Sequence, residues 1–280
     1  MSKQRRAGLV GLGMMGRHHA RVLGSLEGVE LVAVCDPMGD AHNVAGGRKV
    51  FTKVSELIAE GIDYAMVAAP TAFHEELALK LADAGVHALV EKPLAVDTPS
   101  ALKIYEAFKS KNLVGAVGHI ERYNPALQQL RKRLDNGELG SVYQITTRRQ
   151  GPFPARIADV GVIKDLATHD IDSTAWVARA KYASVSARTA HKSGREHEDM
   201  VAAVCDLDSG VITNHACYRT CRSLGSCSCR QLNFASSSKN SVFIKSSYSS
   251  KSRGRKLGEF NRITSHRTCR KIGNFIVIKV

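Results

Sequence analysis

The stretch RAGLVGLGMMGRHHARVLGSLEGVELVAVCD, residues 6–36, decides the fold of the N-terminal half of the chain. It reads as a short apolar strand, a glycine turn over residues 11–16, a helix over residues 17–25 and a second strand over Val29–Cys35, of which residues 31–35 are all apolar. An uninterrupted apolar run of this length is typical of a parallel sheet buried on both faces. The stretch therefore predicts one complete βαβ unit.

Strands and helices continue to alternate as far as residue 120. Helices are expected over residues 54–60, 75–84 and 100–111, and strands over residues 64–68, 87–90 and 113–118. This alternation is typical of an α/β fold with a doubly wound parallel sheet. We therefore predict a dinucleotide-binding Rossmann domain over residues 1–120.

Residues 121–215 have a different pattern. Asn124 and Pro125 supply the N-cap and first-turn proline of a helix over residues 126–135, and a second helix is expected over residues 162–178. Strands are expected over residues 142–149, 183–189, 200–207 and 211–215. This pattern predicts an incomplete α+β substrate domain with an antiparallel sheet.

The composition changes near residue 216. Residues 211–280 contain 14 Lys and Arg but one Asp or Glu, whereas residues 1–210 contain 26 and 25, so the net charge of +14 belongs almost entirely to the C-terminal part. Apart from the apolar run over residues 275–280, such a composition buries too little apolar surface to offset chain entropy. We interpret residues 216–280 as an aberrant basic tail rich in Ser and Cys, arising from a change of reading frame or forming a lineage-specific segment.

The glycine turn has the spacing of a dinucleotide site. Gly11 allows the tight turn, Gly13 the approach of a pyrophosphate and Gly16 close packing of the helix. Asp36 follows Gly16 by 20 residues, where a carboxylate binds the ribose hydroxyls and repels a 2′-phosphate. NAD is therefore the expected cofactor, and NADP stays an alternative. The turn also contains two further predicted cofactor-binding residues, Met14 and Met15.

Three more motifs follow in order: Ala69-Pro70-Thr71 with His74, then Glu91-Lys92-Pro93, then Gly118-His119 with residues 122–125. Together with the glycine turn they resemble the glucose-fructose oxidoreductase and inositol 2-dehydrogenase (Gfo/Idh/MocA) family over residues 5 to about 215. The stretches 151–156 and 160–166 are similar to its nucleotide-sugar 3-dehydrogenase branch.

The resemblance implies roles for individual residues. Lys92 would be the catalytic lysine beside the nicotinamide, and Asp165 and His169 would form the family's Asp-x-x-x-His pair, whose spacing places both on one face of an α-helix. The remaining implied cofactor-binding residues are Pro70, Thr71, His74 and Glu91. The implied substrate-binding residues are His119, Arg122, Arg149, Asp165 and His169.

The resemblance implies an NAD(P)-dependent oxidoreductase that transfers hydride between a nicotinamide and a hydroxyl of a sugar, cyclitol or nucleotide sugar. His169 would act as base or relay, Asp165 would orient it, and Lys92 would bind the reacting oxygen or itself be the base. A homo-oligomer is expected for the family, but the loss of its last strands puts that assembly in doubt here.

Three other hypotheses remain open. The first is a relative that binds a dinucleotide but is catalytically impaired. The second is a nucleic-acid-binding protein, although the basic tail lacks a pattern of stacking aromatic residues, so no specific nucleic-acid partner is expected. The third is a zinc module at His215, Cys217, Cys221, Cys227 and Cys229, whose spacing misses the usual paired ligand sets, so no metal is expected.

The sequence offers no membrane or export signal. No run approaches the roughly 20 apolar residues of a membrane helix. The apolar run over residues 7–15 is interrupted by glycines and is not followed by a cleavage site of small residues. We therefore expect a cytoplasmic enzyme with a small-molecule substrate and no membrane partner.

Overall fold

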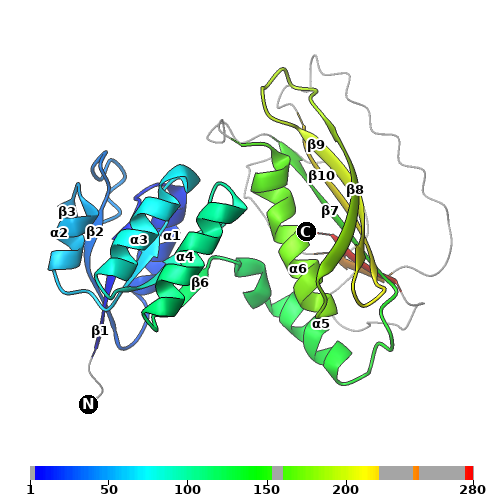
Figure 1. Cartoon of the computed structure of the whole chain (residues 1–280), viewed down its shortest axis with the longest axis horizontal. Coiled ribbons are helices and arrows are strands. Elements are labelled where there is room, and N and C mark those ends of the chain that lie inside the picture. Colours follow the sequence, from blue (N-terminus) through cyan, green and yellow to red (C-terminus); the bar gives the residue numbers. More distant parts are fainter. Residues whose placement is uncertain (1–3, 153–159, 221–241, 246–274, 280) are drawn as a thin grey trace, which may run out of the picture. The chain divides into compact units, whose positions relative to one another are not determined.

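The computed structural model describes residues 4–152, 160–220, 242–245 and 275–279 (Figure 1). Contacts divide the chain into two compact units, Met1–His119 and Ile120–Val280, each with its own sheet. Most of the predicted basic tail lies outside the described residues, as do residues 153–159. No helix in the described part of the chain is long and apolar enough to cross a membrane.

The first unit is a six-stranded parallel sheet with the strand order β3-β2-β1-β4-β5-β6. Its strands are β1 (Arg5–Val10), β2 (Val29–Cys35), β3 (Lys49–Phe51), β4 (Tyr64–Val67), β5 (His87–Val90) and β6 (Gly115–Val117). They are connected through α1 (Met14–Leu23), α2 (Val54–Ala59), the 3-10 helix η1 (Thr71–Phe73), α3 (His74–Asp83) and α4 (Thr98–Ser110). Because β2 and β3 lie on one side of β1 and the later strands on the other, the predicted doubly wound fold is confirmed.

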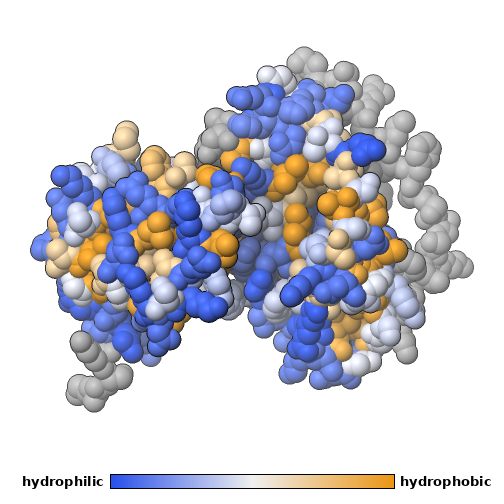
Figure 2. All heavy atoms as spheres, viewed as in Figure 1, coloured by the Kyte–Doolittle hydropathy of each residue, from blue (hydrophilic) through white to orange (hydrophobic). Residues whose placement is uncertain are grey.

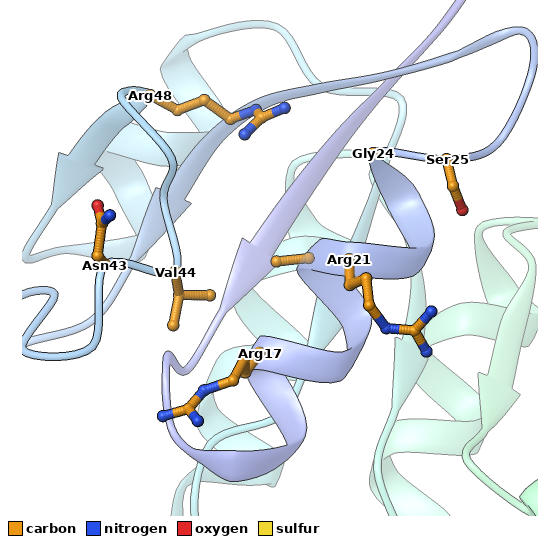
Figure 3. A pocket seen from close by; sticks show the side chains of 8 residues that line it. Arg17, Arg21, Gly24, Ser25, Asn43, Val44 and Arg48 are labelled. Atoms are coloured by element: carbon orange, nitrogen blue, oxygen red, sulfur yellow. The ribbon is translucent and has the colours of Figure 1, made fainter.

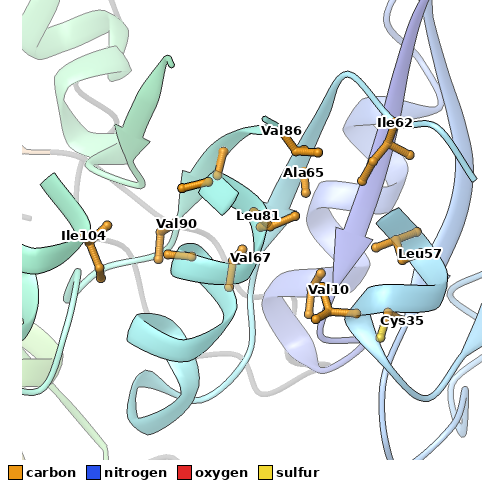
Figure 4. Close-up of a cluster of buried hydrophobic side chains, with 14 of the residues drawn as sticks. Val10, Cys35, Leu57, Ile62, Ala65, Val67, Leu81, Val86, Val90 and Ile104 are labelled. Atoms are coloured by element: carbon orange, nitrogen blue, oxygen red, sulfur yellow. The ribbon is translucent and has the colours of Figure 1, made fainter. Parts of the chain in front are cut away.

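The sheet of this unit is buried on both faces. One face packs against α2, α3 and α4 in a cluster that includes Leu57, Val67 and Leu81 (Figure 4). The other face packs against α1, with Leu9 and Leu23 in a second cluster. On the visible surface of the unit, hydrophobic side chains form only small patches between hydrophilic ones (Figure 2). This two-sided burial is the reason why residues 31–35 of β2 form an uninterrupted apolar run.

The second unit has a mixed six-stranded sheet with the order β11-β12-β7-β10-β9-β8. Its elements are the 3-10 helix η2 (Ile120–Tyr123), α5 (Pro125–Asp135), β7 (Gln144–Pro152), the π-helix η3 (Ile163–Ala167), α6 (Thr168–Ala178), β8 (Tyr182–Ala190), β9 (Met200–Leu207), β10 (Ile212–Thr220), β11 (Val242–Lys245) and β12 (Phe275–Lys279). Helix α6 lies along one face of the sheet (Figure 1).

Two features of this sheet differ from the sequence-based expectation. Only β8, β9 and β10 pair antiparallel; β7 pairs parallel with both β10 and β12, and β12 pairs parallel with β11. A helix and a hairpin separate β7 from β10, so the chain returns to the sheet in its original direction. Strand β10 also continues to Thr220, with Cys217 fully buried, so the sheet includes the first residues of the segment predicted to be aberrant.

The hairpin of β8 and β9 is closed by Asp199, which is 2% exposed. Its carboxylate accepts hydrogen bonds from the backbone N–H groups of Lys192 and Ser193 at 2.6 and 2.7 Å, and from the Ser193 hydroxyl at 2.6 Å. Burial alone would raise the pKa of the Asp199 carboxyl, but these hydrogen bonds outweigh burial and lower its pKa.

The same hairpin holds the start of η3. The Glu198 carboxylate accepts a hydrogen bond from the backbone N–H of Ile163 at 2.9 Å, and the Glu198 carbonyl accepts one from Val162 at 3.1 Å. A Cβ at Gly161 would overlap the Glu198 carboxylate, so a larger residue there would displace the carboxylate from this position. The hairpin therefore fixes where the segment leading into α6 begins.

We expect Asp199→Asn to lower the free energy of unfolding of the second unit by about 1–3 kcal/mol at pH 7, because its three donors lose a charged acceptor. The pKa of Asp199 is lower in the folded than in the unfolded chain, where it is about 3.9. The stabilisation is therefore complete above about pH 4 and is lost as the pH falls through the folded pKa. Urea unfolding followed by the fluorescence of the single tryptophan, Trp176, measures the change.

The matched control is Glu196→Gln, which removes an exposed carboxylate from the same loop. Equal destabilisation by the two substitutions would contradict the role of Asp199. So would a difference between wild type and Asp199→Asn that stays constant down to pH 2.

Candidate functional site

Helix α1 begins directly after a glycine turn at the carboxyl end of β1. Gly11 has a φ of +91°, and a Cβ there would lie 2.6 Å from the backbone of Ala68 and Ala69. At Gly13, the N-cap of α1, nothing lies within 4 Å of the position of a Cβ. Because α1 has neither a side-chain cap nor an acidic residue in its first turn, its N-terminus is suited to an anion.

Asp36 follows β2 directly and lies beside this turn. Its carboxylate accepts hydrogen bonds from the backbone N–H groups of Leu12 at 2.8 Å and Met38 at 2.9 Å. Each carboxylate oxygen has a further lone pair, so both can still accept a hydrogen bond from a ligand hydroxyl. The structure therefore brings together the glycine turn and the acidic residue, as their spacing in the sequence predicts.

His74 lies between the segments that follow β4 and β5. It is 1% exposed, and its Nε2 lies 2.9 Å from the Ala69 carbonyl oxygen. Its Nδ1 lies 3.0 Å from the carbonyl oxygen of Pro93 and 3.3 Å from that of Leu94. Both ring nitrogens of His74 therefore contact backbone carbonyl oxygens. His74 joins the segments after β4 and β5, and these two segments contain other predicted cofactor-binding residues.

Glu91 and Lys92 follow β5 at the same edge of the sheet. Glu91 is 6% exposed, its Oε1 lies 2.8 Å from Nε2 of His19 on α1, and its Oε2 accepts a hydrogen bond from the backbone N–H of Lys92 at 3.2 Å. His19 is not among the predicted site residues. Its position three residues after Gly16, and so on the same side of α1, is the signal that could have identified it.

The carboxyl ends of β1, β2, β4 and β5 thus bring the predicted cofactor-binding residues to one edge of the first unit. A groove of about 380 Å³ lies elsewhere on this unit, along α1 (Figure 3), and is lined by Arg17, Ala20, Arg21, Gly24, Ser25, Asn43, Val44 and Arg48. None of these residues is among the predicted site residues. Arg48 donates to the carbonyl oxygens of Leu31 and Ala45, at 2.7 and 2.9 Å, and so helps to hold the loop after β2.

In the second unit, His169 lies in the first turn of α6 and Asp165 lies in the preceding π-helix. Both side chains are half-buried, and Asp165 Oδ2 lies 2.5 Å from Nη2 of Arg219 on β10. Asp165 and His169 would lie on one face, as expected, only if an α-helix included both residues. In the π-helix the hydrogen bonds run from i to i+5, so a spacing of four residues no longer corresponds to one α-helical turn.

Comparison with known families agrees with this architecture. Residues 5–119 match an oxidoreductase family with an NAD-binding Rossmann fold, and residues 127–229 match the GFO/IDH/MocA C-terminal domain. The chain belongs to the GFO/IDH/MocA oxidoreductase family. The match continues past residue 215, where the sequence motifs end, in agreement with the observed length of β10.

The alignments of this chain with individual relatives extend over about two thirds of each relative's length. The chain is 33% identical over 220 residues to the UDP-N-acetylglucosamine 3-dehydrogenase of Acidithiobacillus ferrooxidans, which covers 78% of this chain and 68% of the relative. It is 28% identical over 225 residues to an inositol 2-dehydrogenase of Corynebacterium glutamicum, covering 76% and 67%. The WlbA dehydrogenase from Bordetella pertussis, solved in complex with NADH and UDP-GlcNAcA, aligns with a TM-score of 0.72 at 26% identity, covering 78% and 68%.

Two arginine ion pairs in the second unit differ in burial. Arg149 Nη2 lies 3.0 Å from Asp170 Oδ1 and 3.2 Å from Glu121 Oε1, and the Asp170 side chain is 1% exposed. Burial alone would lower the pKa of Arg149, but the two carboxylates outweigh burial and raise its pKa. Arg122, by contrast, is 44% exposed and makes a two-pronged contact with Asp172. Arg149 therefore ties α6 to β7, and its binding of substrate stays a prediction.

Two of the residues considered as zinc ligands are described, and both have other partners. His215 contacts the hydroxyls of Thr147 and Tyr182, at 2.7 and 2.8 Å, and burial lowers its pKa. The Cys217 thiol lies 3.2 Å from Asp170 Oδ2, and burial, followed by the Asp170 charge, raises its pKa. The other three, Cys221, Cys227 and Cys229, lie outside the described residues.

We expect Arg149→Met to lower the free energy of unfolding of the second unit by about 3–5 kcal/mol, because it leaves the Asp170 carboxylate buried without its cation. Arg133→Met is the matched control and should cost about 0–1 kcal/mol, since the Arg133 and Glu138 side chains of its ion pair are 35% and 45% exposed. Urea unfolding followed by Trp176 fluorescence compares the two. Equal losses would contradict the distinction between the buried and the exposed pair.

Proposed function

We propose that this chain is an NAD-dependent dehydrogenase that oxidises a hydroxyl of a sugar, cyclitol or nucleotide sugar. The proposal depends on one observation: the glycine turn, Asp36 and Lys92 lie at the same edge of a parallel sheet. In doubly wound folds, ligands bind outside the carboxyl ends of the strands. The dehydrogenase activities named for the relatives support the same reaction class.

The residues at this edge fit a dinucleotide. The uncapped start of α1 would take the pyrophosphate, with the open space at Gly13 allowing it to approach the backbone. Asp36 would accept hydrogen bonds from the ribose hydroxyls and would repel a 2′-phosphate, which favours NAD over NADP. Met38, 90% exposed, and Phe73, 53% exposed, offer apolar surface at the same edge for an adenine ring. When bound, NAD accepts a hydride at its nicotinamide ring.

The chain's own residues would supply orientation and proton transfer. We assign Lys92 to the reacting oxygen, where its ammonium would stabilise developing negative charge. His169 would take the hydroxyl proton on a ring nitrogen, and Asp165 would favour the protonated form of that ring. Lys92 could take the proton instead of His169, and the two assignments differ in which substitution abolishes the proton-transfer step.

A second candidate is a relative that binds NAD without turnover. The observation that favours it is the change of composition within the second unit, where residues 211–280 have a net charge of +13. A substrate site that depends on that region would be lost, while the dinucleotide site of the first unit would remain.

We expect NADH to bind saturably to wild type and to Lys92→Ala, with dissociation constants within about threefold, because most cofactor contacts lie elsewhere. NADPH should bind at least about tenfold more weakly, a difference of about 1.4 kcal/mol. With a panel of inositols and UDP-sugars, Lys92→Ala should lower kcat by about 10²–10⁴-fold. NADH fluorescence titration and absorbance at 340 nm measure these quantities, with the exposed Lys53→Ala as control.

Each contrary outcome has a distinct meaning. A folded chain that binds neither dinucleotide contradicts the proposed function. Binding of NADH without turnover across the panel selects the impaired relative. Full activity in Lys92→Ala removes Lys92 from the reaction.

A further inference from the structure

The buried carboxylate of Glu91 has two different partners. One oxygen lies 2.8 Å from Nε2 of His19, and the other accepts the backbone N–H of Lys92 at 3.2 Å. The His19 and Glu91 side chains are 14% and 8% exposed. The contact therefore links α1, whose start forms the glycine turn, to the residue proposed to act on the substrate.

The space around this carboxylate is closed by the segment after β6. A Cβ at Gly118 would lie 2.9 Å from Glu91 Oε2 and 3.2 Å from Glu91 Cα. The backbone N–H of Gly118 also donates to the Val90 carbonyl at 2.8 Å. Glu91 therefore contacts His19 on one side and lies close to the backbone of Gly118 on the other, where a larger residue would crowd the carboxylate.

A second histidine holds the chain immediately after Lys92. His74 on α3 contacts the carbonyl oxygens of Pro93 and Leu94 through Nδ1 and that of Ala69 through Nε2. Two histidines from two different helices therefore hold the chain on either side of Lys92. His19 acts before it, through Glu91 and the Lys92 N–H, and His74 acts after it, at the carbonyl groups of Pro93 and Leu94.

We propose that His19 and His74 are positioning residues that fix the backbone of Lys92 from both sides. The proposal rests on the role of Lys92 in the proposed function. A lysine side chain has four rotatable bonds, so its ammonium can be placed accurately only if its Cα does not move. Neither histidine contacts the reacting atoms in this assignment, and both act through the backbone.

A purely structural role for His19 makes a different prediction. If His19 only stabilises the packing of α1, its loss lowers the melting temperature and leaves the chemistry of Lys92 unchanged. If it positions Lys92, its loss leaves the Glu91 carboxylate without its partner on α1, so the backbone N–H of Lys92 loses a fixed acceptor. The surroundings of the Lys92 ammonium then change, and with them its rate of acylation.

The experiment compares His19→Leu, His19→Asn and His19→Gln in the full-length chain without cofactor. The Gln amide reaches as far as imidazole Nε2 and can still donate to Glu91, whereas the Asn amide is one bond too short and Leu has no donor. The matched control is His18→Leu, which changes the exposed neighbouring histidine on the same helix. Acetic anhydride at pH 8.5 acylates the lysines, and mass spectrometry gives the rate at Lys92 relative to that at the exposed Lys53.

We expect the acylation rate of Lys92 to differ at least threefold from that of wild type in His19→Leu and His19→Asn, and to return close to the wild-type rate in His19→Gln. In the holoenzyme the same two variants should lose at least tenfold in kcat with KM changed less than threefold, and the control should match wild type. His19→Asn keeps a polar side chain on α1 and serves if His19→Leu does not fold.

An unchanged Lys92 rate in a folded His19→Asn or His19→Leu protein overturns the proposal, and so does an equal loss in His19→Gln. Because acylation is measured without cofactor or turnover, this outcome is separate from a failure of the proposed function. That failure would appear as a folded chain that binds neither NADH nor NADPH, whereas full activity in Lys92→Ala would only remove Lys92 from the reaction.

Discussion

The close approach of Gly11 to the end of β4 is the constraint on which the first unit depends. Its N–H donates to the Cys35 carbonyl at 2.8 Å, and its Cα faces the backbone of Ala68 and Ala69 with no room for a Cβ. The turn is therefore pressed between the ends of β2 and β4. A side chain here would push β4 outward or displace α1, and the anion site at the start of α1 would change with it.

The rest of the predicted cofactor site follows from this arrangement. Because the strands are parallel, the residues that follow them all emerge at the same edge of the sheet. Asp36 is held there by the backbone of Leu12, and the segment after β5 is held by Glu91, His19 and His74. These contacts are partly buried and join residues of the chain itself, so the edge is organised before any ligand binds.

Parts of the fold that depend on local pattern could be predicted from the sequence. The apolar run over residues 31–35 of β2 and the Asn124 cap of α5 both depend on neighbouring residues, and both agree with the structure. Strand β3 could not be predicted, because three largely exposed residues show no periodicity. The π-helix η3 at the start of the helix expected over residues 162–178 could not be predicted from local pattern either. Its first residue, Ile163, donates its backbone N–H to Glu198, a contact between residues far apart in the sequence.

The candidate site divides in the same way. Gly11, Gly13 and Asp36 could be identified from their spacing in the sequence, and the structure brings them together. The His19–Glu91 contact spans 72 residues and the Arg149–Asp170 contact 21, and neither pair has a spacing that a local pattern could reveal. Arg149 in particular was predicted from the family resemblance to bind substrate, whereas its most direct contacts are the buried carboxylates that hold α6 to the sheet.

A crystal structure of the chain with bound NAD tests the central claim, that one edge of the parallel sheet is the dinucleotide site, most directly. The pyrophosphate oxygens should lie about 2.7–3.2 Å from backbone N–H groups at the start of α1. A ribose hydroxyl should donate to Asp36, and the nicotinamide should lie next to Lys92. A dinucleotide bound away from the glycine turn, or with its nicotinamide remote from Lys92, would contradict the claim.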